Sequence, residues 1–262
     1  MNNLFDKVYC LNLLRCPDRR AHMIREFSKI GITKYTFFEA TDKDSPEVKD
    51  AFRSGFVNNN YRPFKPLTNS EIGNFISFRR IFKDIIRNNI KFALICEDDL
   101  NFMAYAETVL FSVLSPNNMH RYGINLKYPT LIRLGWKKSS DHHYNGNINV
   151  IPFTRISNPC FAINLEMAKK LDAKLHSMTT PSDVYIHKII APQYKHHTVF
   201  PPIAHDLSQS TNAKFRSEIL PRKRAIAPYS SPSTPSSSSS GKYVNLSTIH
   251  LRRKKLLELG HT

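Results

Sequence analysis

Short apolar runs alternate with amphipathic stretches along the first half of the chain. The apolar runs predict strands at residues 7–13, 35–38, 92–96 and 130–134. Between them, apolar side chains recur every three or four positions and predict helices at residues 18–30, from 46 onward, from 69 to about 85 and at 104–114. Strands that alternate with helices in this way are typical of an α/β fold with a mostly parallel sheet.

The starts of three predicted helices carry residues that can satisfy free backbone N–H groups. Asp18 can cap the first helix, which Gly31 ends. Pro46 suits the first position of the second helix, where its missing N–H costs nothing. Thr68 and Glu71 fit a capping box, in which each side chain accepts a hydrogen bond from the backbone N–H of the other residue. These signals support the helices that the apolar periodicity predicts.

The second half of the chain is less regular. Residues 160–163 predict a strand, and Asn164 can cap a helix that runs to about Leu175. A later strand ends at Phe200, and we expect a loop over residues 203–211. The chain shows no internal repeat.

Composition divides the chain into a folded body and a basic end. With 262 residues, 41% of them apolar, it can bury one substantial core, which we expect within residues 1–220. Residues 221–241 are rich in Ser and Pro and predict a disordered linker. The formal net charge is +17, and nearly half of the excess lies beyond residue 213. We therefore expect a basic tail at 242–262, with a short helix, that docks on an anionic membrane surface or a partner.

Several targeting and metal signals are missing from the sequence. No apolar run is long enough for a transmembrane helix, and the N-terminus does not resemble a secretory signal. The four cysteines form no C-x-x-C pair, which disfavours a structural zinc site. We interpret the chain as a cytoplasmic protein that can be peripheral to a membrane.

Three consecutive acids, Glu97, Asp98 and Asp99, follow the apolar run at 92–96. In an open α/β sheet, ligands collect at the carboxyl ends of the strands, where these side chains are expected. Adjacent carboxylates repel each other, and a divalent cation such as Mn²⁺ or Mg²⁺ relieves that repulsion. A metal there could bridge the phosphates of a nucleotide ligand. The alternative is a solvated acidic turn without a ligand.

Two further residues are candidates for chemistry, and each has a simpler alternative. Asp183 at a helix start could act as a general base, or it could complete a capping box with Thr180. His205 could complete a metal shell as a neutral imidazole, or it could be a solvated loop histidine.

Polar residues that suit phosphate follow the first strand. They are Asn12, Arg15 and Arg19, and arginine binds phosphate through paired hydrogen bonds. The alternative is an exposed basic helix start, although positive charge there opposes the helix dipole.

An ordered set of motifs resembles glycosyltransferase family 25, which includes lipooligosaccharide and collagen galactosyltransferases. The set comprises Val8–Leu13 with Arg15 and Pro17-Asp18-Arg19, then Phe38-Glu39-Ala40-Thr41-Asp42, Leu67–Asn74 with Ser77, Leu94–Asp99 and Pro181-Ser182-Asp183. Their order and spacing agree over about residues 7–210. Each motif is weak alone, and the ordered set is fairly specific.

The resemblance implies a GT-A fold, a Rossmann-like α/β/α sandwich with a mostly parallel central sheet. It implies an inverting transfer of a sugar, galactose as the best guess, from a UDP-linked donor to a hydroxyl of a glycan, lipooligosaccharide or protein acceptor. Asp183 would be the base. The metal, Mn²⁺ or Mg²⁺, would be held by Asp98, Asp99 and His205. The nucleotide would lie beside Asn12, Arg15, Arg19, Glu39, Asp42, Glu97 and Asp98.

This chain departs from the family pattern in its long helix. The family often has Gly-Cys and Ser-His where this chain has Gly73-Asn74 and Ser77-Phe78. Two other functions stay open at this point. One is a different metal-dependent enzyme on phosphate substrates, such as a nucleotidyltransferase or phosphatase. The other is a non-catalytic protein that binds nucleic acid or another anion, although no nucleic acid is expected for the folded domain.

Overall fold

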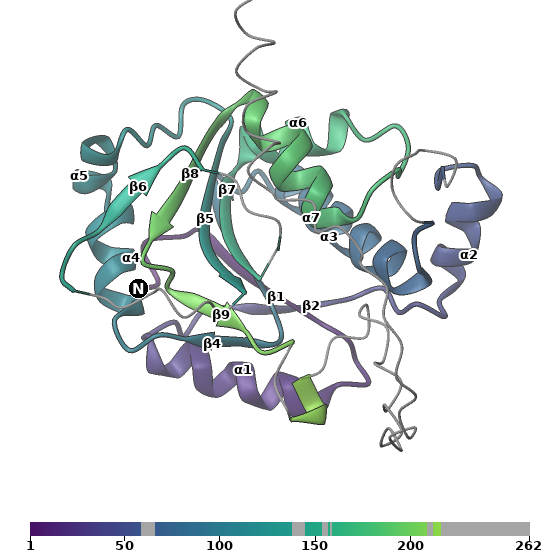
Figure 1. Cartoon of the computed structure of the whole chain (residues 1–262), viewed down its shortest axis with the longest axis horizontal. Coiled ribbons are helices and arrows are strands. Elements are labelled where there is room, and N and C mark those ends of the chain that lie inside the picture. Colours follow the sequence, from purple (N-terminus) through teal and green to yellow (C-terminus); the bar gives the residue numbers. More distant parts are fainter. Residues whose placement is uncertain (59–65, 138–144, 154–156, 158, 209–211, 216–262) are drawn as a thin grey trace, which may run out of the picture. The chain divides into compact units, whose positions relative to one another are not determined.

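A computed structural model of the chain describes residues 1–58, 66–137, 145–153, 157, 159–208 and 212–215 (Figure 1). The chain divides into two units, Met1–Pro221 and Arg222–Thr262. All of the second unit lies outside the described residues. The linker expected at 221–241 and the basic tail expected at 242–262 therefore stay predictions.

A nine-stranded sheet runs through the described part of the chain. Seven strands follow one another in the order β2-β1-β3-β7-β5-β8-β6, and β9 joins β4 to β5. The strands are β1 (Lys7–Asn12), β2 (Thr36–Glu39), β3 (Phe92–Glu97), β4 (Leu100–Phe102), β5 (Thr130–Lys137), β6 (Asn149–Ile151), β7 (Cys160–Asn164), β8 (Lys195–Phe200) and β9 (Ala204–Asp206).

Most strands of the sheet point in one direction. The pairs β1–β2, β1–β3, β5–β8 and β5–β9 are parallel, whereas β7 runs antiparallel between β3 and β5. Strands β4 and β6 also run against the common direction. The expected α/β fold with a mostly parallel sheet is confirmed.

Helices cover both faces of the sheet (Figure 1). Side chains of β1 alternate between the two cores: Tyr9 and Leu11 face one, and Val8 and Cys10 face the other. Apolar side chains of α2, α3 and α6 fill the first core, and those of α1 and α4 fill the second. The helices are α1 (Pro17–Lys29), α2 (Pro46–Arg53), α3 (Asn69–Arg87), α4 (Ala106–Leu114), α5 (Pro116–Met119), α6 (Leu165–Ala173) and α7 (Ser182–Val184).

Short helical turns complete the described part. They are η1 (His120–Tyr122), η2 (Tyr185–Ile190, a π-helix), η3 (Ala191–Gln193) and η4 (Ala213–Phe215). None of the helices in the described residues is long and apolar enough to span a membrane.

The start of α3 follows the sequence signals, whereas the start of α1 does not. Thr68 and Glu71 form the expected capping box, with the Glu71 N–H 3.2 Å from Thr68 Oγ1 and the Thr68 N–H 2.8 Å from Glu71 Oε2. Asp18 does not cap α1, because Pro17 takes the first helical position and Cys16 precedes it. Proline favours that position through its fixed φ and its lack of an N–H.

The loop expected over residues 203–211 contains a strand instead. β9 pairs antiparallel with β4, where Leu100 lies opposite Asp206 and Asn101 lies opposite His205. It also pairs parallel with the end of β5. Strands β4 and β9 have three residues each, too few to show an alternating pattern in the sequence. Their pairing brings two distant parts of the chain to the same edge of the sheet.

Gly73 allows α3 to approach the backbone that follows β2. A Cβ atom added to Gly73 would lie 2.5 Å from the Thr41 carbonyl oxygen. One turn later, Ser77 Oγ accepts a hydrogen bond from the Thr41 N–H at 2.8 Å. Together the two residues fix the position of Thr41 against the helix.

We predict that Gly73→Ala lowers the free energy of unfolding by about 1–3 kcal/mol, because the new methyl group overlaps the Thr41 carbonyl. In an unconstrained helix interior the same substitution stabilises by roughly 0.5–1 kcal/mol. Urea unfolding of the wild type and the variant measures the sign. Stabilisation would show that α3 does not need this close approach.

Candidate functional site

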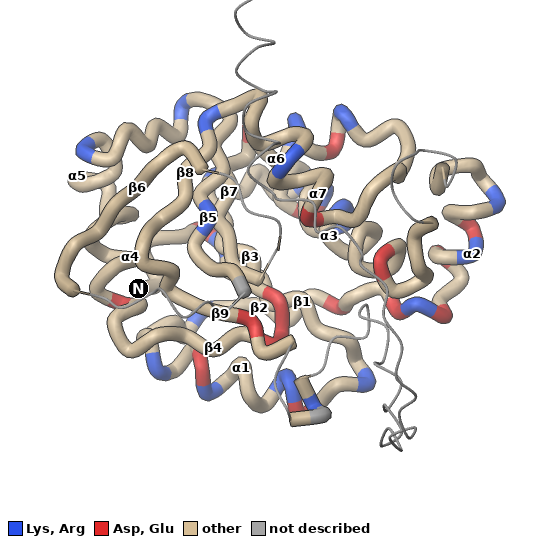
Figure 2. Tube along the Cα trace, in the orientation of Figure 1, with Lys and Arg blue, Asp and Glu red and all other residues tan. Residues whose placement is uncertain are grey.

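The three predicted acids, Glu97, Asp98 and Asp99, lie at the carboxyl end of β3, where the chain turns into β4 (Figure 2). They form the acidic turn. Asp98 and Asp99 are buried, each with 7% of its surface exposed, and Glu97 is half-buried. Because β1 is the parallel neighbour of β3, its last residue, Asn12, reaches the same edge. The structure thus places the three acids and Asn12 at the same end of the sheet.

Asp98 is held by two of the residues that were predicted to bind phosphate. Arg19 Nη1 lies 2.9 Å from Asp98 Oδ1, and Asn12 Nδ2 donates to Asp98 Oδ2 at 2.7 Å. Both carboxylate oxygens thus have a donor, and the Arg19 pair is largely shielded from water. An ion pair of this kind is costly to break on one side, because the remaining charge stays buried.

Asp99 differs from Asp98 in having an unsatisfied oxygen. Its Oδ1 is buried and has no hydrogen-bond partner among the described residues. Burial raises the pKa of Asp99 to about 7, and the charges of Asp98 and Asp206 add to the effect, while Arg19 opposes it. The ionised form of the Asp99 carboxylate is therefore electrostatically unfavourable at this position.

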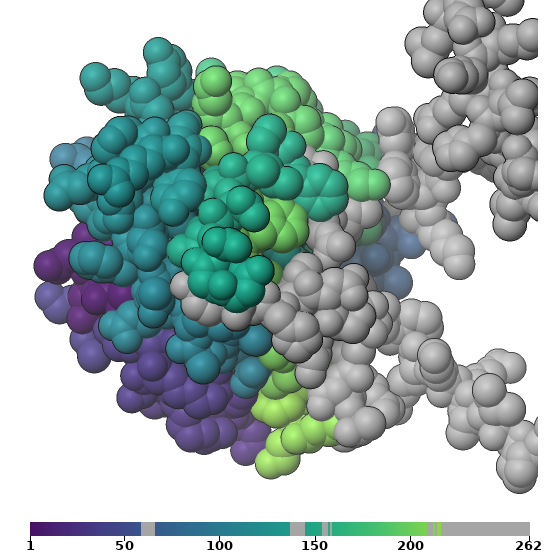
Figure 3. All heavy atoms as spheres, turned by 60° about the vertical axis from the view of Figure 1, so that its left-hand side comes forward, coloured from purple at the N-terminus to yellow at the C-terminus, as the bar shows by residue number. Residues whose placement is uncertain are grey.

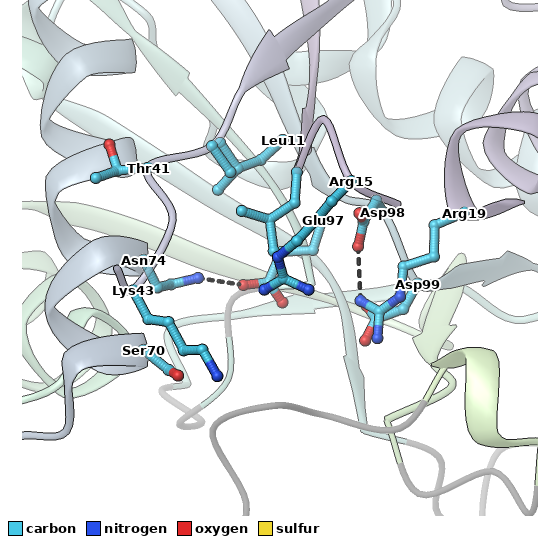
Figure 4. Close-up of a pocket in the computed structure, with 12 residues that line it drawn as sticks. Leu11, Arg15, Arg19, Thr41, Lys43, Ser70, Asn74, Glu97, Asp98 and Asp99 are labelled. Carbon is cyan, nitrogen blue, oxygen red and sulfur yellow. Dashed lines mark hydrogen bonds and ion pairs between the residues drawn. The ribbon is translucent and has the colours of Figure 1, made fainter. Parts of the chain in front are cut away.

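Glu97 faces the long helix α3. Burial raises the pKa of Glu97 well above its ordinary value, and the charge of Asp99 raises it further. Asn74 Nδ2 donates to Glu97 Oε1 at 3.3 Å and opposes the shift (Figure 4). Asn74 was not among the predicted site residues, since a lone asparagine in a helix carries no sequence signal.

Asp206 is the second residue near the acidic turn that the predictions missed. Its charge raises the pKa of both Glu97 and Asp99. His205 precedes it on β9, and neighbouring residues on a strand point to opposite faces. The structure thus brings Asp206 close to the turn, and His205 as a metal ligand stays a prediction.

An open cleft lies in front of the acidic turn (Figure 4). Acidic side chains form one part of its wall and basic side chains another. The lining residues are Leu11, Leu13, Arg15, Arg19, Ala40, Thr41, Lys43, Ser70, Asn74, Glu97, Asp98 and Asp99. Such a wall suits a ligand that carries negative charge and can share a cation with the carboxylates.

The segment after β2 contributes a second ion pair at this cleft. Arg15 Nε lies 2.5 Å from Asp42 Oδ2, so two of the residues predicted near a nucleotide contact each other. Glu39 ends β2 beside Asn12 in register, but it is not among the described residues that line the cleft. Lys43, which does line it, lacked a sequence motif that would have singled it out.

Asp183 lies in α7 and is not among the described residues that line the cleft. The capping box expected with Thr180 is wrong: α7 begins at Ser182 after Pro181, and no side chain caps it. Burial raises the pKa of Asp183, although a hydrogen bond from the Val184 N–H, at 2.8 Å, and the charge of Arg133 lower it. Asp183 is therefore a half-buried carboxylate whose affinity for a proton is above normal.

Arg133 is a further residue near Asp183 that the sequence did not indicate. It lies on β5 with 1% of its surface exposed and acts electrostatically on both Asp183 and His187. A single arginine within an apolar strand has no pattern that reveals burial.

The carboxylates offer few ligands for a metal ion in this conformation. Among the residues that the structure describes, no three His, Cys, Asp or Glu side chains converge as a metal site. Asp99 Oδ1 is the oxygen left without a hydrogen bond. Mg²⁺ and similar hard cations are often held by one or two carboxylates, with the other positions taken by substrate phosphates and water. The residues fit that kind of site.

The last described residues lie against α1, next to Arg19 (Figure 3). Arg19 Nε donates to the Lys214 carbonyl oxygen at 2.8 Å, and Lys214 Nζ lies 2.9 Å from Asp18 Oδ2. The ring centroids of Phe215 and His22 are 4.7 Å apart. Arg19 is therefore held from two sides, by Asp98 and by the backbone of η4.

We predict that Asp99→Asn stabilises the metal-free protein at pH 8 by roughly 2–4 kcal/mol and has little effect at pH 4. The pKa of Asp99 in the fold lies above its unfolded value, so the ionised carboxylate disfavours folding. That penalty is absent below about pH 4 and complete above about pH 7. Unfolding by urea in EDTA at both pH values measures it.

The exposed Asp50, with 67% of its side chain accessible, is the matched control. Asp50→Asn should change stability by less than about 0.5 kcal/mol at either pH. Equal effects of Asp99→Asn at pH 4 and pH 8 would contradict the assigned pKa.

Two curated relatives are similar over part of this chain. A glycosyltransferase 25 family member of Drosophila melanogaster is 34% identical over 104 residues, which are 38% of this chain and 17% of that protein. Procollagen galactosyltransferase 1 of Danio rerio is 30% identical over 105 residues, again 38% of this chain and 17% of the relative. The chain thus matches about a sixth of the length of these proteins.

Similarity to solved structures is weaker. A crystal structure of a glycosyltransferase involved in the glycosylation of the major capsid of PBCV-1 covers 77% of this chain and 81% of its own, with 8% identity and a TM-score of 0.39. A likeness at that level carries no argument about this fold.

The profile described as glycosyltransferase family 25 (LPS biosynthesis protein) matches residues 5–186. The match includes β1, the acidic turn, α3 and Asp183, so it covers most of the folded part and both groups of candidate residues. The chain belongs to glycosyltransferase family 25.

Proposed function

We propose that this protein is a metal-dependent, inverting glycosyltransferase with a UDP-linked sugar as donor. The observation that carries the proposal is the buried acidic turn at the end of β3, with its unsatisfied Asp99 oxygen, at the wall of a cleft that also has basic side chains. A diphosphate and a divalent cation together complement both parts of that wall. Family membership favours sugar transfer over the nucleotidyltransferase and phosphatase alternatives.

Asp99 and Asp98 would hold Mn²⁺ or Mg²⁺, with His205 as a further ligand in the proposal. Asp98 is engaged by Arg19 and Asn12 in this conformation, so Asp99 is the better placed of the two. When bound, the cation supplies positive charge that stabilises the departing diphosphate. The nearby Asp206 adds negative charge that favours a cation at this position.

The nucleotide would lie along the carboxyl ends of β1 and β2. Arg15 and Arg19 line the cleft and can form charge-assisted hydrogen bonds with phosphate oxygens. Their present partners, Asp42 and Asp98, hold both guanidinium groups in place before a ligand arrives. Asn12, Glu39 and Glu97 complete the proposed surroundings of the nucleotide.

Asp183 would act as the base towards the acceptor. In a single displacement the acceptor hydroxyl oxygen forms a bond with the sugar C1 while the bond from C1 to the diphosphate breaks, and the hydroxyl proton passes to the Asp183 carboxylate. The raised pKa of Asp183 makes it a stronger base than an exposed aspartate.

The sugar and acceptor are proposed from the relatives. Relatives named procollagen galactosyltransferase support galactose as the sugar and a protein as one class of acceptor. The description of the family as an LPS biosynthesis protein supports a lipooligosaccharide or another glycan as further classes. A cytoplasmic location, and docking of the basic tail on an anionic membrane surface, belong to the same proposal.

We predict that UDP with Mn²⁺ raises the melting temperature of the wild type by about 5–10 °C. Ligand at about 100 times its dissociation constant adds roughly 2.7 kcal/mol, which corresponds to several degrees in a domain of this size. The shift should require both compounds and should be absent in Asp99→Ala. Differential scanning fluorimetry with UDP, Mn²⁺, both or neither measures it.

Asp50→Ala removes an exposed carboxylate from α2 and should keep the full shift. The quantity compared is the shift within each variant, because Asp99→Ala also changes the stability of the free protein. No shift with UDP, GDP or CMP in the presence of Mn²⁺ would rule out the proposed donor site.

We predict that Asp183→Asn lowers kcat by about 10²–10⁴-fold and leaves the affinity for UDP unchanged. Asparagine keeps the shape of the side chain and cannot accept the acceptor proton. In the wild type, the rate should fall with acidity at a higher pH than the pKa of an ordinary aspartate, because the base must be ionised. Transfer from UDP-galactose as a function of pH measures both effects, and an Asp183→Asn variant with normal kcat would exclude this residue as the base.

A further inference from the structure

Asn74 connects the acidic turn to the segment that carries Asp183. Its side-chain amide nitrogen donates to Glu97 Oε1 at 3.3 Å, and its amide oxygen accepts from Ser182 Oγ at 2.6 Å. Ser182 is the first residue of α7 and directly precedes Asp183. One side chain therefore contacts both groups of residues to which the proposed function assigns chemistry.

The two hydrogen bonds need the two ends of an amide. The amide nitrogen of Asn74 can only donate, so Glu97 Oε1 is the acceptor of this bond. The Ser182 hydroxyl donates in the other direction and needs an acceptor. An aspartate at position 74 would keep the acceptor for Ser182 and lose the donor to Glu97, and an aliphatic side chain would lose both bonds.

The helix below Asn74 is fixed in place by independent contacts. The capping box of Thr68 and Glu71 closes the first turn of α3, and Gly73 lies against the Thr41 carbonyl. Ser182 itself is buried, with 6% of its surface exposed. Asn74 therefore connects Glu97 and Ser182 from a helix that is itself held in place. Its own position cannot shift without moving α3.

We propose that Asn74 is a positioning residue that holds α7, through Ser182, at a fixed place relative to Glu97. The proposal rests on the function proposed above, because the benefit of the link is the alignment of Asp183 with a donor bound at the acidic turn. Misplacement of a reacting group by about 1 Å can cost 10²-fold in rate without loss of binding. The link should therefore matter more for kcat than for the affinity of the nucleotide.

The experiment compares Asn74→Ala, Ser182→Ala and the double variant. Each single substitution should lower kcat for transfer from UDP-galactose by at least about tenfold. The dissociation constant of UDP with Mn²⁺, from calorimetry, should change by less than about twofold for Ser182→Ala, since Ser182 does not line the cleft. The double variant should be no slower than the slower single variant, because both substitutions break the same link.

Asn88→Ala is the matched control. Asn88 follows the same helix at its other end, and its amide donates to Asp84 within the helix. This variant should keep wild-type kcat. Asn74→Asp should be slower than the wild type, because it keeps the acceptor for Ser182 but loses the donor to Glu97.

Amide exchange of Val184 is measured in the same variants and needs no activity. The Val184 N–H donates to Asp183 Oδ1, so a loosened α7 should exchange it about tenfold faster in Asn74→Ala and Ser182→Ala, with no further gain in the double variant. Unchanged exchange, or independent effects of the two substitutions on kcat, would overturn the positioning role. If the wild type transfers no sugar but Val184 exchanges faster in both single variants, the proposed function is overturned and the structural link between Asn74 and Ser182 is kept.

Discussion

Three neighbouring carboxylates at the end of a buried strand repel one another, and much of the site is arranged around that repulsion. Arg19 and Asn12 bind both oxygens of Asp98, and Asn74 donates to Glu97. Asp99 receives no such donor on Oδ1, and its pKa rises to about 7. The protein thus offsets part of the repulsion with one positive charge and two amide donors, and it leaves Asp99 Oδ1 without a hydrogen bond.

The side chains that donate to these carboxylates come from the elements next to β3. Asn12 ends the neighbouring strand β1, Arg19 lies in the first turn of α1, and Asn74 lies in the second turn of α3. Each element is positioned by the core on its own face of the sheet. Apolar packing therefore sets the distances between charged groups that would otherwise separate, and stability and function share the same contacts.

The apolar pattern was enough to predict β1, β3 and α3, because the two strands are continuous apolar runs and the helix repeats apolar residues every three or four positions. The three acids after β3 indicated the site. The apolar pattern was not enough for β4 and β9, which are set by their pairing with each other rather than by their own residues. Asp206 was missed as a neighbour of Asp99 for that reason. Asn74 and Arg133 could not be predicted either, since their roles depend on partners far away in the chain.

The contact of η4 with α1 has a consequence for the order of folding. Arg19 and the acidic turn are made before β9 and before Lys214, whose carbonyl also holds Arg19. Pairings between such distant segments form slowly, because a long loop must close first. The strands made first can pack while the chain is still growing, but Arg19 gains its hydrogen bond to the Lys214 carbonyl only after η4 has been made.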